Sequence, residues 1–290
     1  YKSMLPSKGR VKVILQTYFG DIRDCYEQVA GLDIDAIGLD FVEGKQSLSL
    51  VKEYGFPKDK LLLAGVVNGK NIWRNHYSRT LALLADLKKT GARIGIGTSC
   101  SLLHVPYTVA QETKLPEYAL KHFSFAEEKL QELRDLSFLF SLENAEPEKI
   151  YQVNDALFQS DRIGKNAAVQ AEVFALKPGD FTRFPSFEER EKLQKTRFRL
   201  PLFPTTTIGS FPQTAEVRSN RAAFRKNLIS GEQYRQFNFD RIKECISLQE
   251  KIGLDVLVHG EFERNDMVEY FGEHLQGFLF TEKAWVQSYG

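Results

Sequence analysis

The chain is 290 residues long, which is enough for one large α/β domain or two ordinary ones. Its 39 basic and 38 acidic residues leave a net charge of +1, so charge gives no reason to expect a nucleic-acid or membrane partner. A hydrophobic content of 42%, with 20 Gly and 10 Pro, is typical of a globular protein and excludes a disordered or collagen-like chain.

The three cysteines, Cys25, Cys100 and Cys245, lie far apart in the sequence. Neither a disulfide framework nor a Cys-x-x-Cys metal knuckle follows from this pattern, so we expect a reducing, cytoplasmic location. No apolar run approaches the ~20 residues that cross a bilayer. Because the chain begins at Tyr1 rather than Met, and stops directly after a strand-like stretch, we expect a piece of a longer protein.

Four short apolar runs in the first hundred residues predict strands of a parallel sheet that is buried on both faces. Their residues are 11–19, 35–42, 61–67 and 93–99. Segments with helical periodicity alternate with them, at residues 22–30, 47–54 and 74–90. This alternation predicts right-handed βαβ units, and therefore a doubly wound sheet or part of a (β/α)₈ barrel.

From Pro116 the pattern becomes helical without strands. Residues 117–140 predict one long amphipathic helix, and a second helix, with Pro147 in its first turn, is expected to run to about residue 158. Residues 162–175 predict a third helix. Phenylalanines, prolines and a charged run at residues 180–199 then indicate a linker.

After this linker the βα pattern starts again. Residues 203–208 predict a strand and residues 213–228 a helix. Ser230 is expected to cap a further helix that runs to about Ile252. Residues 254–258 then predict a buried strand that leads into His259-Gly260-Glu261.

Several familiar motifs are incomplete in this sequence. Gly95-Ile96-Gly97 lacks the third glycine of a dinucleotide fingerprint, and residues 65–71 are one residue short of a phosphate loop. A metal-dependent barrel enzyme of another kind would need three ligands among the cysteines and the five histidines, and no ligand spacing supports that alternative. The simpler interpretation of the three cysteines is that they are buried or lie on helix faces.

The informative positions are two strand exits in the second half, because parallel α/β folds bind ligands at the carboxyl ends of strands. Gly209 lets a ligand approach the backbone, and the N–H groups of Gly209 and Ser210 can hold a carboxylate or a phosphate. The carboxylate of Glu261 can hold an ammonium group. Together they suit the two ends of an α-amino acid. The alternatives are an ordinary tight turn at Gly209-Ser210, and a helix cap or a surface ion pair at Glu261.

Long contiguous strings also resemble the cobalamin-independent methionine synthase family. They are FPTTTIGSFPQT at residues 203–214, GLDVLVHGEFERNDMVEYF at 253–271 and WVQSYG at 285–290. The first half adds LQTYFG at residues 15–20 and SCSLLHVP at 99–106. The resemblance therefore covers nearly the whole chain.

The resemblance implies an enzyme of two (β/α)₈ TIM barrels that transfers a methyl group from 5-methyltetrahydrofolate polyglutamate to homocysteine, giving methionine. It also implies a zinc ion that keeps the attacking thiolate deprotonated. On this basis residues 1–140 are later units of the amino-terminal barrel, 141–200 a helical inter-barrel linker, and 201–290 the first units of the catalytic barrel. Both barrels are then incomplete in this chain.

The family's homocysteine-binding residues correspond to Ile208, Gly209, Ser210 and Glu261, in agreement with the interpretation from the residues alone. The resemblance places the zinc ligands, the catalytic residues and the principal folate contacts outside this chain, so Cys245 and His259 are not expected to bind zinc.

We expect the parent enzyme to be a monomer. The isolated chain is expected to be inactive, and to self-associate through open sheet edges as a dimer in which residues 11–106 of two copies form one pseudo-barrel. The alternative function is a non-catalytic module that binds an amino acid or a folate.

Overall fold

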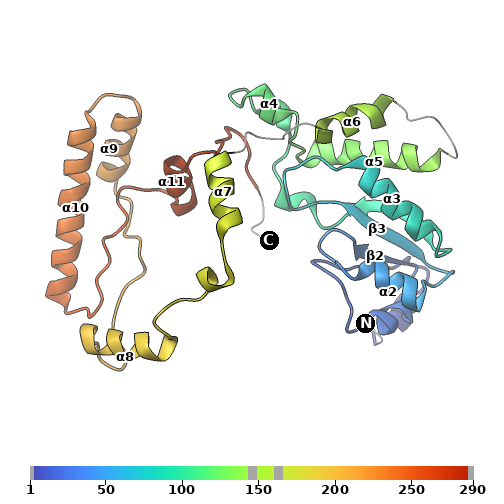
Figure 1. Ribbon diagram of the computed structural model, residues 1–290, viewed down its shortest axis with the longest axis horizontal. Coiled ribbons are helices and arrows are strands. Elements are labelled where there is room, and N and C mark those ends of the chain that lie inside the picture. The colour runs from blue at the N-terminus through green and yellow to red at the C-terminus, as the bar shows by residue number, and fades with distance from the viewer. Residues whose placement is uncertain (1–2, 143–148, 160–165, 287–290) are drawn as a thin grey trace. The chain divides into compact units, whose positions relative to one another are not determined.

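The computed structural model describes residues 3–142, 149–159 and 166–286. Its chain divides into two compact units (Figure 1). Unit 1 comprises Tyr1–Ala167 and Leu279–Gly290, and unit 2 comprises Ala168–Phe278. Pro147 and part of the predicted helix over 162–175 lie outside the described residues.

A parallel sheet of four strands forms the centre of unit 1. The strands pair in their sequence order: β1 (Ile14–Gln16), β2 (Ala36–Asp40), β3 (Leu61–Val67) and β4 (Arg93–Thr98). A doubly wound sheet reverses its strand order at a switch point, and these four strands contain no reversal. Unit 1 is therefore an α/β fold with a parallel sheet, and its strand order is consistent with a barrel-type enzyme.

The helix-covered face of the sheet carries the main core of unit 1. Alternate residues of β3, namely Leu62, Ala64 and Val66, are buried in it, as the two-residue period of a strand requires. Buried residues of α2 (Ser47–Tyr54) and α3 (Tyr77–Lys88) belong to the same cluster: Leu50, Val51, Leu84 and Leu87. Together with the short helix α1 (Tyr26–Ala30), α2 and α3 connect successive strands (Figure 1).

The predicted single helix over residues 117–140 is wrong. The structure has a short helix, α4 (Glu117–Leu120), and then α5 (Ala126–Ser141). The residues between them leave the helical path because their backbone pairs with the loop that follows β3. The N–H of Ser124, for example, donates to the carbonyl of Ile72 at 2.8 Å.

Most other helices lie where the sequence predicts them. In unit 1 α6 spans Lys149–Gln159, and the helices of unit 2 are α7 (Ala167–Ala175), α8 (Phe187–Phe198), α9 (Ala215–Arg225), α10 (Gly231–Ile252) and α11 (Met267–His274). The predicted cap of α10 is confirmed, because the Ser230 hydroxyl accepts a hydrogen bond from the N–H of Gln233 at 3.1 Å. Neither α8, within the predicted linker, nor α11 was expected from the sequence.

The strands predicted over residues 203–208 and 254–258 are wrong. Within the described residues neither segment forms a strand, and the isolated parallel bridge from Ser210 to Gly260 lies just beyond them. The N–H of Val256 also donates to the carbonyl of Thr205 at 3.0 Å. Val256 and Leu257 are each 38% exposed, so the second segment is not buried. A two-stranded pair is marginal unless further strands flank it, and no described residue supplies a third strand here.

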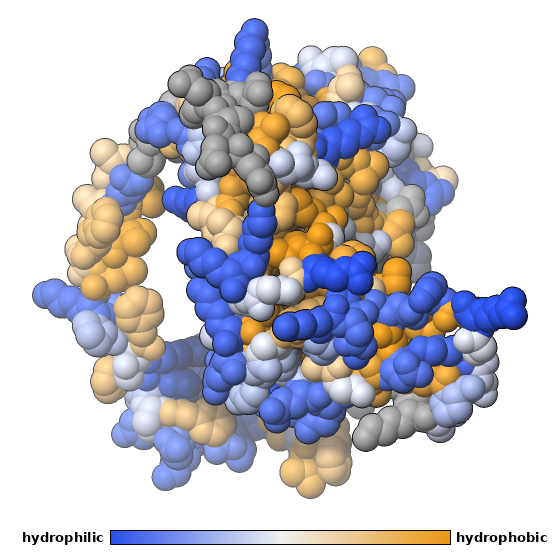
Figure 2. Space-filling view, turned by 90° about the vertical axis from the view of Figure 1, so that its right-hand side faces the viewer, coloured by the Kyte–Doolittle hydropathy of each residue, from blue (hydrophilic) through white to orange (hydrophobic). Residues whose placement is uncertain are grey.

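Much apolar surface remains exposed. Hydrophobic residues gather over the middle of the face drawn in Figure 2. In unit 2 the most exposed of the large apolar side chains are Phe174, Phe181, Phe184, Leu202, Phe203 and Ile208. Extended apolar surface is typical of regions that contact another segment or chain. Across the described ranges, no helix combines the length and the apolar character that crossing a membrane requires.

Candidate functional site

The two turns singled out from the sequence lie against each other in unit 2. The Oε1 atom of Glu261 is 2.7 Å from the position that a Cβ atom on Gly209 would occupy. The backbone keeps the turns together, because the N–H of Phe211 donates to the carbonyl of Gly260 at 2.9 Å. The structure therefore brings the glycine turn and the carboxylate together, although 51 residues separate them in the sequence.

The other two predicted residues lie at the same turn. Ile208 exposes 80% of its surface, and Ser210 is also exposed. The N–H groups of Gly209 and Ser210 donate to no other described residue. Two adjacent N–H donors can bind the carboxylate of an amino acid, and the neighbouring Glu261 side chain can bind its ammonium group.

Glu261 has an unusual backbone conformation for a residue with a side chain. Its φ angle is +58°, and Gly260 before it has a φ of +89°. A Cβ atom on Gly260 would lie 2.5 Å from the ring of Phe262, so glycine is needed at that position. A non-glycine residue with positive φ persists only where its surroundings hold it, and such residues concentrate at functional sites.

A small ion-pair network surrounds the carboxylate. Arg264 Nη2 lies 2.7 Å from Glu261 Oε1, and Arg264 Nη1 lies 2.7 Å from Glu263 Oε1. His259 Nε2 is 3.1 Å from the same oxygen of Glu263. Burial by itself raises the pKa of the Glu263 carboxyl, but the hydrogen bond from His259 and the nearby charges hold that pKa below its usual value. The surface ion pair considered for Glu261 is thus present, and a substrate ammonium would share the carboxylate with Arg264.

Two residues that contact this turn were missed from the sequence. Gln213 Nε2 donates to the carbonyl of Glu261 at 3.3 Å, and Arg221 contacts the turn from α9. A signal for Arg221 was present. It stands four residues after Val217, the buried residue of α9, so it lies on the inward face of that helix.

The described residues do not fit a zinc ion. In residues 3–142, 149–159 and 166–286 no three His, Cys, Asp or Glu side chains are grouped so that they could hold a metal. Burial raises the pKa of the Cys245 thiol, which lies 3.1 Å from Gln249 Nε2, whereas zinc binds the thiolate. His259 is engaged by Glu263. The described residues therefore contain no set of ligands for the alternative of another metal-dependent enzyme.

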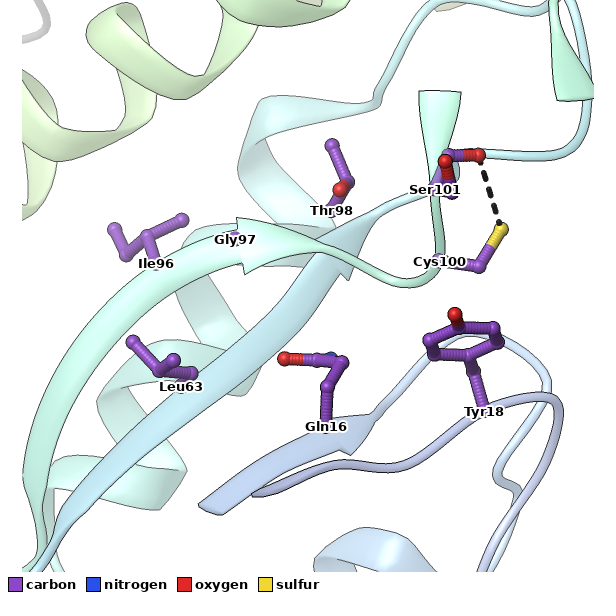
Figure 3. Close-up of a pocket in the computed structure, with 8 residues that line it drawn as sticks. All are labelled: Gln16, Tyr18, Leu63, Ile96, Gly97, Thr98, Cys100 and Ser101. Atoms are coloured by element: carbon purple, nitrogen blue, oxygen red, sulfur yellow. Dashed lines mark hydrogen bonds between the residues drawn. The ribbon is translucent and has the colours of Figure 1, made fainter. Parts of the chain in front are cut away.

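Unit 1 contains a second candidate site, a cavity of about 440 Å³ at the carboxyl ends of β1 and β4 (Figure 3). It is lined by Gln16, Tyr18, Leu63, Ile96, Gly97, Thr98, Cys100 and Ser101. Burial raises the pKa of the Cys100 thiol, which donates to the carbonyl of Ser101 at 3.8 Å. Because its lining carries no charged side chain, this cavity suits a charged amino acid less well than the Gly209–Glu261 turns do.

The parallel four-stranded sheet with its connecting helices places unit 1 in the broad class of α/β proteins. A family model described as "Cobalamin-independent synthase, N-terminal domain" matches residues 1–92. A second, "Cobalamin-independent synthase, Catalytic domain", matches residues 203–290. The chain belongs to the cobalamin-independent synthase family, and the resemblance seen in the sequence is confirmed.

Curated relatives agree with this assignment. The chain is 56% identical over 290 residues to the 5-methyltetrahydropteroyltriglutamate–homocysteine methyltransferase of Campylobacter jejuni (strain RM1221). It is 55% identical over 290 residues to the protein of the same name from Lactococcus lactis subsp. cremoris (strain SK11). Each comparison covers 100% of this chain and 38% of the relative. The chain thus spans well under half the length of these relatives.

Proposed function

We propose that the natural protein carrying this chain transfers a methyl group from 5-methyltetrahydropteroyltriglutamate to homocysteine in the cytoplasm. The names of the relatives and the two family matches support this activity. We also propose that residues 1–140 and 201–290 belong to two successive barrels joined by a helical linker at 141–200. The sequential order of the four parallel strands supports the first barrel.

In this proposal the turns at 208–210 and 261 hold the amino-acid end of homocysteine. The observation that carries it is the 2.7 Å approach between Glu261 Oε1 and the Cβ position of Gly209. The ammonium group pairs with Glu261, and the N–H groups of Gly209 and Ser210 donate to the substrate carboxylate. These contacts fix the position of the homocysteine side chain, and orientation of a reactant is itself a large part of a catalytic effect.

The described residues bind and orient the substrate, and other parts of the protein are expected to activate it. A zinc ion, when bound, would keep the homocysteine sulfur deprotonated and nucleophilic. Its ligands are proposed to lie outside this chain, as are the principal folate contacts. The isolated 290-residue chain is accordingly expected to bind homocysteine weakly and to transfer no methyl group.

The alternative is a non-catalytic module that binds an amino acid or a folate. Intact mass and zinc analysis of the natural protein, followed by a methyl-transfer assay, separate the two functions. Stoichiometric zinc with methionine formation supports the methyltransferase. Calorimetry that shows sub-millimolar binding of homocysteine or a folate, without any methyl transfer by the zinc-loaded natural protein, supports the module.

A further inference from the structure

We infer that Arg221 is a positioning residue that holds Glu261 in its substrate-binding orientation. This inference rests on the proposed function of the Glu261 turn. Arg221 itself is not expected to touch the substrate, and its effect on homocysteine binding is expected to pass through the turn.

The guanidinium of Arg221 donates several hydrogen bonds to the residues around the Glu261 turn. Its Nη2 atom lies 2.6 Å from Gln213 Oε1, 3.0 Å from the carbonyl of Phe262 and 3.0 Å from the carbonyl of Arg264. The two N–H groups of one nitrogen are therefore shared among three oxygens. One of these oxygens precedes α9 and the other two follow Glu261, so a single side chain ties together the two segments that form the site.

Arg221 also sets the orientation of the Gln213 amide. Since the guanidinium can only donate, it selects the amide oxygen of Gln213. The amide nitrogen then faces the carbonyl of Glu261 and donates to it at 3.3 Å. Contacts that start at Arg221 thus reach Glu261 through Gln213 on one side and through the backbone of residues 262–264 on the other.

These contacts matter because the backbone of Glu261 would otherwise relax. A φ of +58° is unfavourable for a residue with a Cβ atom, and it persists only when neighbouring groups hold it. If the carbonyls of Phe262 and Arg264 lost their shared donor, Glu261 could return to negative φ. Its carboxylate would then leave the position beside Gly209 where the substrate ammonium is proposed to bind.

A positive charge alone would not replace this arrangement. A lysine at position 221 keeps the charge but has a single tetrahedral ammonium in place of the planar guanidinium, whose several nitrogens fix its orientation. Arg225, one turn later on α9, provides the matched control. Its side chain is 58% exposed and pairs with Glu269 at 3.4 Å, so its removal takes a guanidinium from the same helix and leaves the turn intact.

The test is a double-mutant cycle in the natural full-length protein, with homocysteine affinity measured by calorimetry and KM by methyl transfer. Arg221→Gln and Glu261→Gln are each expected to weaken homocysteine binding by roughly 10-fold, and the double variant by little more than either one, because both act on the same carboxylate. Arg221→Lys is expected to restore only part of the affinity. The control variant Arg225→Gln is expected to bind homocysteine with unchanged affinity. The KM for the folate substrate is expected to stay unchanged in all of these variants.

If Arg221 only stabilised the fold, its replacement would lower the folded fraction by the same amount whether or not the Glu261 carboxylate is present. The effects of Arg221→Gln and Glu261→Gln on homocysteine binding would then be additive. Additive effects in the cycle, or full rescue by Arg221→Lys, would overturn the inference and leave the proposed function intact. If Glu261→Gln itself leaves homocysteine affinity unchanged, the proposed binding site fails and the inference falls with it.

Arg221→Gln also removes hydrogen bonds from a part-buried position, so this variant could fail to fold. Gln213→Leu then replaces it in the cycle, because it breaks only the link between Arg221 and the carbonyl of Glu261. We expect Gln213→Leu to weaken homocysteine binding by several-fold, and to add little when combined with Glu261→Gln. Additivity for this pair would overturn the inference in the same way.

Discussion

Asp255 and Thr205 lie fifty positions apart in the sequence, and they exchange hydrogen bonds in both directions. The Oδ2 atom of Asp255 accepts from the N–H and from the hydroxyl of Thr205, each at 2.8 Å. The N–H of Asp255 in turn donates to the carbonyl of Thr205 at 3.2 Å. This pair joins the two extended segments four residues before Gly209 and six residues before Glu261, so it fixes how the two turns meet.

The first prediction concerns the pH dependence of this pair. The N–H and the hydroxyl of Thr205 hold the pKa of the Asp255 carboxyl below its usual value. Because the folded-state pKa is lowered, the stabilisation is present at neutral pH and is lost as the pH falls through and below about 4. Asp255→Asn should therefore flatten the acid limb of a plot of urea midpoint against pH.

Asp240→Asn is the control for this measurement, because Asp240 is exposed and, among the described residues, its side chain accepts a hydrogen bond only from Gln236, one turn away on α10. An acid limb for Asp255→Asn that superimposes on those of the wild-type and Asp240→Asn proteins would contradict the role of Asp255.

The second prediction concerns Glu261. In the natural protein, Glu261→Gln should raise the homocysteine KM by roughly 10-fold or more, since an ion pair in a shielded site contributes more than ~1.4 kcal/mol. Thermal stability should change little, because the ion pair that is lost, with Arg264, is only partly buried. Steady-state kinetics and thermal unfolding measure the two effects.

Glu263→Gln is the matched control, since it removes the neighbouring carboxylate that pairs with the same arginine. It should raise the homocysteine KM less than Glu261→Gln does. A Glu261→Gln protein with unchanged KM but a much lower melting temperature would assign Glu261 a structural role.

The third prediction concerns Gly209. Apart from its two chain neighbours, the Glu261 carboxylate is the only group in the described part of the chain that a Cβ atom here would meet within 4 Å. Gly209→Val should therefore displace the carboxylate and weaken homocysteine binding by roughly 10-fold, and it should disturb folding more than Ser210→Ala does. Calorimetry and unfolding curves on both variants provide the comparison. Normal homocysteine binding by Gly209→Val would contradict the proposed site.

The fourth prediction concerns the isolated 290-residue chain. Within the described residues β1 and β4 each pair on one side only, and such open edges recruit other strands. We expect a dimer in which residues 11–106 of two copies complete one pseudo-barrel about a two-fold axis. Sedimentation of a mass-verified chain tests this, and a well-folded monomer at micromolar concentration would refute it.

The same preparation tests the expected lack of activity. With zinc and both substrates added, methionine should not form above background. Turnover by the isolated chain would mean that residues discounted above build a metal site after all.

The sequence predicted unit 1 better than unit 2, for physical reasons. The strand at residues 61–67 and the helix at residues 47–54 begin and end where the sequence predicts. A continuous apolar run and a clear helical period are local signals, so both elements could be located from the sequence alone. The segments at 203–208 and 254–258 also contain β-branched and apolar residues, but strand formation depends on neighbours that the local sequence does not report. The break between α4 and α5 likewise depends on pairing with a loop about fifty residues earlier.

The site shows the same division. Gly209 and Glu261 could be named from the sequence, because a glycine and a carboxylate that follow β-rich runs are recognisable even though neither run forms a strand. The contact between them could not, since it depends on the bridge from Ser210 to Gly260 and on a positive φ at Glu261. Arg221 was missed because an arginine on a helix normally faces solvent, and only the folded chain shows the carbonyls that it binds.

The order β1-β2-β3-β4 also bears on how the chain is made. Each strand after the first finds its partner already synthesised, because that partner is the strand immediately before it in the chain. The four-stranded sheet of unit 1 can therefore grow strand by strand as it leaves the ribosome, and the pairing among these four strands does not wait for a distant segment. The turn of Glu261 is different, because the segment carrying Thr205 and Gly209 remains unpaired until some fifty further residues have emerged.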